Sequence, residues 1–127
     1  MKVFLLLCMI FAHIVDDYYL QGILAKLKQR EWWKENAPDD MYKNDYKVAL
    51  LMHAFSWAFM VMLPAVIFRT MEGLALPKAT LAMFVINMMQ HAWVDDLKAN
   101  KREINLITDQ AMHMVQIVAI WMIFVMV

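Results

Sequence analysis

The sequence predicts an all-α integral membrane protein: a bundle of four transmembrane helices with an interfacial cytoplasmic segment between the first and second helices. Hydrophobic residues make up 63% of the 127 residues, and the mean hydropathy is +0.49. A soluble domain of this length cannot bury so much apolar surface. Only two glycines and three prolines are present, and helices satisfy their own backbone hydrogen bonds in lipid. The length indicates one transmembrane domain, residues 1–127.

Four apolar segments approach the length of about 20 residues that a helix needs to cross a bilayer. They cover approximately residues 3–27, 48–68, 79–97 and 105–127. Neighbouring aspartates interrupt the apolar runs of the first and third segments. A soluble four-helix bundle is the alternative, but it needs a polar stripe on every helix. Residues 55–68 and 115–127 carry almost no polar side chains, so the pattern favours the membrane.

The charges predict an orientation in the bilayer. Nine of the twelve lysines and arginines fall in or beside the loops after the first and third segments. The positive-inside rule therefore places these loops in the cytoplasm and both termini outside, in a bacterial inner membrane. Residues 28–46 mix tryptophans and tyrosines with charges, which is typical of a segment in the headgroup region. The formal net charge is zero, which gives no indication of a nucleic-acid partner.

All four histidines lie inside the apolar segments, and three of them have an aspartate one helical turn away. The pairs are His13 with Asp17, His91 with Asp95, and Asp109 with His113, while His53 stands alone. Residues four apart share a helix face. The order is reversed in the fourth segment, which cancels the reversal of chain direction, so all three histidines lie deeper than their aspartates. Ionisable residues in membrane helices usually face the bundle interior, and we expect one site that opens to the cytoplasmic leaflet.

The chemistry of these side chains predicts a metal site. Imidazole and carboxylate suit zinc, and also manganese or iron, whereas a single cysteine, Cys8, excludes a cysteine-rich zinc site. The candidate ligands are His13, Asp17, His53, His91, Asp95, Asp109 and His113. They exceed what one tetrahedral ion takes, so either two ions share them or some aspartates orient histidines from outside the ligand shell. A proton relay is the main rival reading of the same residues.

Neighbouring polar residues receive lesser roles. Gln21 extends the helix face of the first pair by one turn, and Gln110 follows Asp109, so either is placed to position a ligand or a substrate. Asp16 and Asp96 point elsewhere on their helices, and we expect them at the membrane interface.

The ordered motifs also resemble a known family. The run His13-x-x-x-Asp17-Tyr18-x-x-Gln21, His53, His91-x-x-x-Asp95-x-x-Lys98 and Asp109-Gln110-x-x-His113 resembles the small bacterial and phage membrane proteins grouped as domain of unknown function 3307. The resemblance covers most of the chain and implies a polytopic protein whose His/Asp set acts together, without supplying an activity. More loosely, the His-x-x-x-Asp pattern is similar to that of membrane-bound metal-dependent hydrolases.

Three functions fit these expectations. In the first, a zinc hydrolase cleaves a lipid or lipid-linked substrate, because zinc lowers the pKa of bound water to about 7. Asp17, Asp95 or Asp109 then acts as the base, and Lys98 neutralises an anionic headgroup. The second is a non-enzymatic bacterial or phage module, holin-like or an exclusion factor, with a structural metal. The third is a metal or proton transporter. The bilayer is the expected partner in each case, and the sequence is compatible with a homo-oligomer.

Overall fold

The computed structural model describes residues 1–126, and that part of the chain is almost wholly helical with no strand. Its α-helices are α1 (Lys2–Ile14), α2 (Leu24–Leu27), α3 (Arg30–Asn36), α4 (Asp45–Met71), α5 (Thr80–Asp96) and α6 (Leu106–Met126). Two π-helical turns, Val15–Leu20 and Leu97–Lys101, continue α1 and α5, and a 3₁₀ turn covers Asp40–Tyr42. The prediction of an all-helical chain is confirmed.

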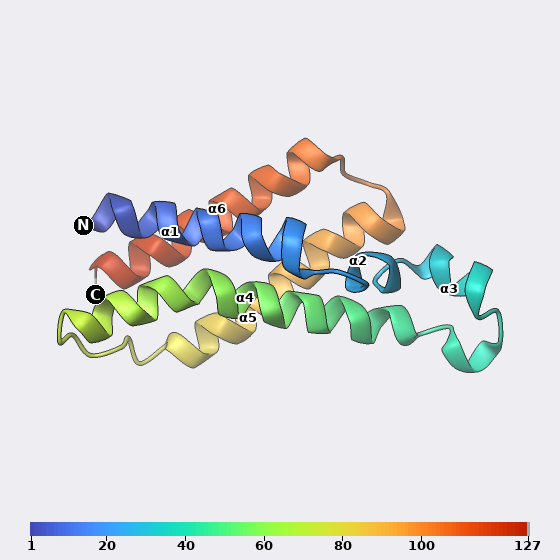
Figure 1. The fold of residues 1–127 in the computed structure, drawn as a ribbon, viewed down its shortest axis with the longest axis horizontal. Coiled ribbons are helices and arrows are strands. Elements are labelled where there is room, and N and C mark those ends of the chain that lie inside the picture. Colours follow the sequence, from blue (N-terminus) through green and yellow to red (C-terminus); the bar gives the residue numbers. More distant parts are fainter. Residues whose placement is uncertain (127) are drawn as a thin grey trace.

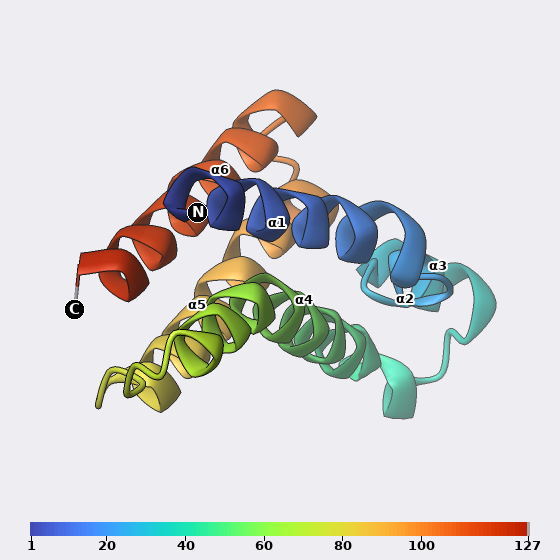
Figure 2. The same ribbon diagram turned by 60° about the vertical axis from the view of Figure 1, so that its left-hand side comes forward.

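The four long helices pack together and alternate in direction (Figure 1). α4 makes its most extensive contacts with α1 and α5, and α6 packs against α1 and α5. Figures 1 and 2 show α1 and α6 on one side of the molecule and α4 with α5 on the other. Both chain ends lie at the same end of the long axis, whereas α2 and α3 lie towards the opposite end (Figure 1).

The first long helix is shorter than predicted. It ends at Leu20 instead of continuing to residue 27, and the chain then forms the separate short helix α2. The break lies at Gly22, whose φ is +48°. This left-handed backbone conformation is readily accessible to glycine and is incompatible with a continuing α-helix. α4, in contrast, extends beyond the predicted 48–68 at both ends and continues through Pro64.

The outer surface of the bundle is more apolar than that of a soluble protein. Large apolar side chains are exposed along the helices, among them Phe4, Phe11, Phe55, Ile107 and Val115. An apolar core lies in the half of the bundle nearer the termini, and it includes Met9, Trp57, Val61, Ile117 and Phe124. Most buried charged groups lie in the other half. An apolar exterior around an ionisable interior is the arrangement expected in lipid.

Three helical stretches are long and apolar enough to span a membrane: Lys2–Leu20, Asp40–Met71 and Leu106–Met126. α5 has 17 residues and ends in two aspartates, which keeps it outside this set. By length and composition, the predicted spanning segments are therefore supported for three of the four long helices.

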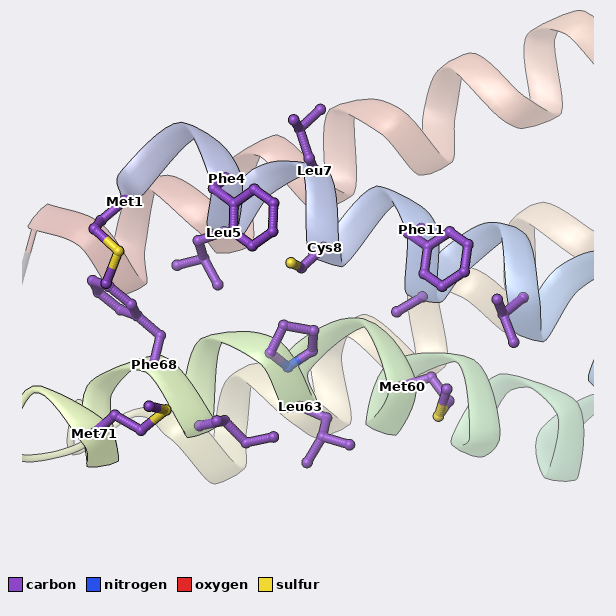
Figure 3. Close-up of a pocket in the computed structure, with 14 residues that line it drawn as sticks. Met1, Phe4, Leu5, Leu7, Cys8, Phe11, Met60, Leu63, Phe68 and Met71 are labelled. Atoms are coloured by element: carbon purple, nitrogen blue, oxygen red, sulfur yellow. The ribbon is translucent and has the colours of Figure 1, made fainter.

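An apolar groove of about 790 Å³ runs between α1 and α4 (Figure 3). Its walls include Phe4, Cys8 and Phe11 on the α1 side and Met60, Leu63 and Met71 on the α4 side. Along α1 the groove extends as far as Val15, the residue directly before Asp16. None of the lining residues that the structure describes belongs to the polar half of the bundle, and along the chain the groove ends one residue before the buried Asp16.

Candidate metal centre

Seven ionisable side chains from all four long helical stretches meet inside the bundle, each at most 5% exposed. They are Asp16 and Asp17 of the π-helical turn Val15–Leu20, His53 of α4, His91 and Asp95 of α5, and Asp109 and His113 of α6. Buried charges are costly unless they are paired or coordinate a metal. The partners of each group therefore decide what the cluster does.

Asp17, His53, His91 and Asp95 form the first donor group, in which one donor atom of each residue lies within 4.8 Å of the others. The His53 Nε2 atom is 3.2 Å from Asp17 Oδ1 and 3.3 Å from His91 Nε2. Asp95 Oδ2 lies 3.4 Å from His53 Nε2 and 3.8 Å from His91 Nε2. Ligand atoms around a tetrahedral zinc ion with bonds of about 2.0–2.2 Å are about 3.3–3.6 Å apart. Four of the six separations in the first donor group are thus close to those of a four-ligand zinc site, and all six are within 4.8 Å.

Asp95, Asp109 and His113 form a second donor group beside the first. His113 Nε2 lies 3.5 Å from Asp95 Oδ1 and 3.4 Å from Asp109 Oδ1. All three of these atoms are buried and have no hydrogen-bond partner in the described part of the chain. The groups are also linked through the Nδ1 atoms of His91 and His113, 3.3 Å apart, where one ring donates to the other.

Two lysines touch the carboxylates of the cluster. The Lys28 Nζ atom donates to Asp95 Oδ2 at 2.5 Å, and the Lys98 Nζ atom donates to Asp109 Oδ2 at 2.5 Å. Lys28, which follows α2, is only 6% exposed. Burial lowers the pKa of Lys98, just beyond α5, but its hydrogen bond to Asp109 and the charges of the nearby aspartates together more than offset this, so the pKa lies above its usual value. Lys98 is therefore a cation at neutral pH.

The lysines leave the cluster with an excess of negative charge. Its four carboxylates face two ammonium groups, so two formal negative charges remain if the histidines are neutral. This excess equals the charge of one divalent cation. In a low-dielectric interior such an excess is strongly unfavourable, and a bound metal ion or protonated histidines must balance it.

His13 lies beside the cluster but belongs to neither donor group. Its Nδ1 atom accepts from Trp57 Nε1 at 2.7 Å, so its proton is on Nε2, which donates to Gln110 Oε1 at 3.0 Å. Gln110 Nε2 then donates to Asp17 Oδ2 at 3.1 Å and to Asp109 Oδ2 at 3.0 Å. Both ring nitrogens of His13 are thus engaged, and the residue holds Gln110 in position. Gln110 thus links the carboxylates of Asp17 and Asp109, and its role in positioning a ligand or a substrate stays a prediction.

The expectation that Asp16 lies at the interface is wrong, because this carboxylate is 1% exposed. Its Oδ1 atom accepts from Ser56 Oγ at 2.5 Å, and its Oδ2 atom lies 3.8 Å from His53 Nδ1. The reason is the π-helical turn, in which the hydrogen bonds skip one further residue than in an α-helix. The extra residue brings both Asp16 and Asp17 to the inner face. A carboxylate behind a histidine is a common way to orient a metal ligand.

The remaining polar residues named from the sequence, Gln21 and Asp96, lie at the edge of the buried cluster. Gln21 Nε2 donates to the backbone oxygen of Asp17, so it steadies the end of the π-helical turn rather than a donor atom. Asp96 is partly buried and accepts from Asn100 Nδ2 at 2.8 Å. Lys28, Ser56 and Trp57 are missing from the sequence-based set. The Trp57 ring stacks on His91 with centroids 4.2 Å apart, a contact that no sequence spacing indicates.

Comparison with known proteins gives one decisive match. The family described as Protein of unknown function (DUF3307) matches residues 5–127. The chain belongs to this family. Membership in DUF3307 confirms the resemblance drawn from the His/Asp motifs, and the family's description assigns no activity. No curated protein and no solved structure matches the chain, so the similarity to membrane-bound hydrolases gains no support from these comparisons.

Proposed function

We propose that this DUF3307 protein is a membrane-embedded metalloprotein that binds a zinc-type divalent cation through Asp17, His53, His91 and Asp95. The observation that carries the proposal is the convergence of four buried donor atoms within 4.8 Å of one another, with four of their six separations at 3.2–3.8 Å, close to the edges of a tetrahedral site. Manganese or iron accepts the same ligands. The excess of two negative charges supports a divalent ion, since binding makes the buried cluster formally neutral.

The surrounding residues also suit a metal ligand set. Once His53 binds metal through Nε2, its proton is on Nδ1, facing the unpartnered Asp16 Oδ2 atom 3.8 Å away. A small closure of that gap makes the carboxylate–histidine–metal arrangement common in zinc proteins. Stacking on Trp57 holds the ring of His91. The two imidazole ligands are thus oriented by different neighbours.

The membrane placement is part of the same proposal. All four long helices, α5 included, cross a bacterial inner membrane, with both termini outside and the metal centre towards the cytoplasmic leaflet. The apolar outer surface and the three long apolar helices support it. The basic residues near α2, α3 and the end of α5 support the orientation. Reporter fusions at both termini test it, and a cytoplasmic signal from either end contradicts it.

We extend the proposal to hydrolysis of a lipid or lipid-linked substrate, with the metal supplying activated water. The apolar groove between α1 and α4 supports a lipid, since it is lined by side chains such as Phe4 and Phe11 and extends to Val15, next to Asp16 (Figure 3). Among the aspartates that were candidates for the base, Asp17 and Asp95 belong to the first donor group and are not free for that role. Lys98 contacts Asp109 and is partly exposed, so its ammonium lies at the edge of the cluster, where an anionic headgroup would meet it.

A structural metal is the second candidate, and one observation favours it. The first donor group provides four ligands, which fill a tetrahedral coordination shell as in structural zinc sites. Transport has less support, because Ile117, Ile120 and Phe124 are packed between the polar half and the terminal end of the bundle, each at most 2% exposed.

The test is the metal content of detergent-purified protein by elemental analysis, under chelator-free conditions. We expect stoichiometric zinc, manganese or iron in the wild type and its loss in Asp17→Asn and His53→Ala. Asp39→Asn, an exposed carboxylate in the loop after α3, is the matched control and keeps the metal. Wild-type protein without metal, even after incubation with excess zinc, refutes the proposal and leaves protonated histidines as the balancing charge.

A further inference from the structure

The two oxygen atoms of Asp95 face different donor groups. Oδ2 lies 3.4 Å from His53 Nε2 in the first group, whereas Oδ1 lies 3.5 Å from His113 Nε2 in the second. A carboxylate that turns one oxygen to each of two ligand sets has the arrangement of a bridge between two cations. Two-metal sites hold their ions about 3.5–4 Å apart, a spacing that such a bridge permits.

The donor atoms of the second group are buried and lack hydrogen-bond partners in the described part of the chain, as expected of a cation site. His113 Nε2 lies 3.5 Å from Asp95 Oδ1 and 3.4 Å from Asp109 Oδ1, and none of these three atoms makes a hydrogen bond within residues 1–126. Each of the three residues is 0% exposed, so bulk water does not solvate these atoms. Buried polar atoms in native proteins are nearly always paired. A metal ion bound by all three satisfies them together, whereas a proton on His113 Nε2 is shared between two carboxylate oxygens at 3.4–3.5 Å.

From this geometry we propose a second metal position formed by Asp95, Asp109 and His113, bridged to the first by Asp95, with a coordination place open to an outside ligand. The inference rests on the proposed function, because it adds an ion to the same centre. Three protein ligands with a free fourth place characterise catalytic zinc sites, whereas four characterise structural ones. The first ion thus joins the helices, and the second is the one with a coordination place for a further ligand.

The second ion binds more weakly than the first. One divalent ion already balances the excess of two negative charges, so the second enters a neutral cluster that includes Lys98. The contact between His91 and His113 acts in the same direction. When His91 binds metal through Nε2, its Nδ1 donates to His113 Nδ1 across 3.3 Å. The one proton of neutral His113 is then on Nε2. A second cation can bind this atom only if the proton leaves to solvent and His113 becomes an imidazolate, or if the Nδ1–Nδ1 contact opens and the proton moves to Nδ1.

Titration of metal-free full-length protein in detergent with Mn²⁺ alone tests this position. We expect two ions per chain in the wild type, the second at least tenfold weaker, and magnetic coupling between them in the electron paramagnetic resonance spectrum. Asp109→Asn, similar in size to the native residue, should bind one ion with the affinity of the first and show no coupling. Asp39→Asn should behave as the wild type. Asp109→Asn protein that still binds two coupled ions overturns the inference.

The open place is tested with Co²⁺-loaded protein and azide, a small anion that coordinates transition metals. Azide should change the visible spectrum of the two-ion wild type and leave that of Asp109→Asn unchanged. An unchanged wild-type spectrum shows a closed centre and overturns the open place. A wild type with one ion, lost in His53→Ala, overturns this inference and leaves the proposed function intact. A wild type with no ion overturns both.

Discussion

Lys28 offers a sharp test because its ammonium and the proposed metal ion share one ligand atom. The Lys28 Nζ atom is 2.5 Å from Asp95 Oδ2, and a bound zinc ion lies about 2 Å from the same oxygen. The two cations are then no more than about 4.5 Å apart. At an effective dielectric constant of about 20, the repulsion between one and two charges at that distance is about 7 kcal/mol. A flexible lysine relieves much of this by moving away.

Substitution of Lys28→Met therefore has opposite effects on the two forms of the protein. Without metal, Asp95 loses its buried ion-pair partner, which costs about 3–5 kcal/mol of stability. With metal, repulsion is removed, and we expect zinc affinity to rise at least tenfold, or about 1.4 kcal/mol. Competition titration against a chelator measures the affinity, and unfolding in mixed micelles measures the stability. Lys26→Met, an exposed neighbour, is the control. Zinc affinity that is unchanged or lower in Lys28→Met contradicts the assignment of Asp95 as a ligand.

Three other substitutions give distinct outcomes. His13→Gln should keep the metal stoichiometry of the wild type, since both ring nitrogens are engaged by Trp57 and Gln110; elemental analysis that shows metal loss makes His13 a ligand. Asp16→Asn should lower metal affinity about 10- to 100-fold without changing the number of ions, as expected for a residue that orients a ligand; an unaltered affinity in a chelator competition assay removes that role. Gly22→Ala should destabilise the fold by about 1–2 kcal/mol in micelle unfolding, because alanine is strained at φ +48°. A stability equal to that of the wild type shows that the turn adapts.

Helical spacing was enough to predict most of the side chains that the two donor groups bring together. Residues four apart share a face in any α-helix, so the pairs formed by His91 with Asp95 and by Asp109 with His113 follow directly from the sequence. Alternating chain direction then brings them to one depth, and the structure joins Asp95, Asp109 and His113 in one group. The same reasoning made His13 a candidate ligand like the other three histidines. Helical spacing does not indicate that Trp57 and Gln110 engage both nitrogens of that ring.

The departures arise where the backbone is not α-helical. At α-helical spacing, Asp16 and Asp17 are expected to point in different directions. In the π-helical turn, both side chains lie in the interior of the bundle. Gly22 ends the first helix early and turns the chain into α2. That change of direction carries Lys28 back to Asp95, 67 residues away in sequence. If the first helix continued to residue 27 as predicted, Lys28 would be one of several basic residues in the following loop. Its contact with Asp95 could therefore not be predicted from the sequence.

X-ray absorption spectroscopy of the zinc-loaded protein measures the ligand set of the bound ion. We expect a zinc shell of nitrogen and oxygen only, at about 2.0–2.2 Å, with the outer-shell scattering of at least two imidazoles, and no bound zinc in His53→Ala carried through the same loading. A shell of oxygen alone, without imidazole scattering, or an unchanged zinc spectrum from His53→Ala, would place the metal elsewhere and contradict the proposed ligands.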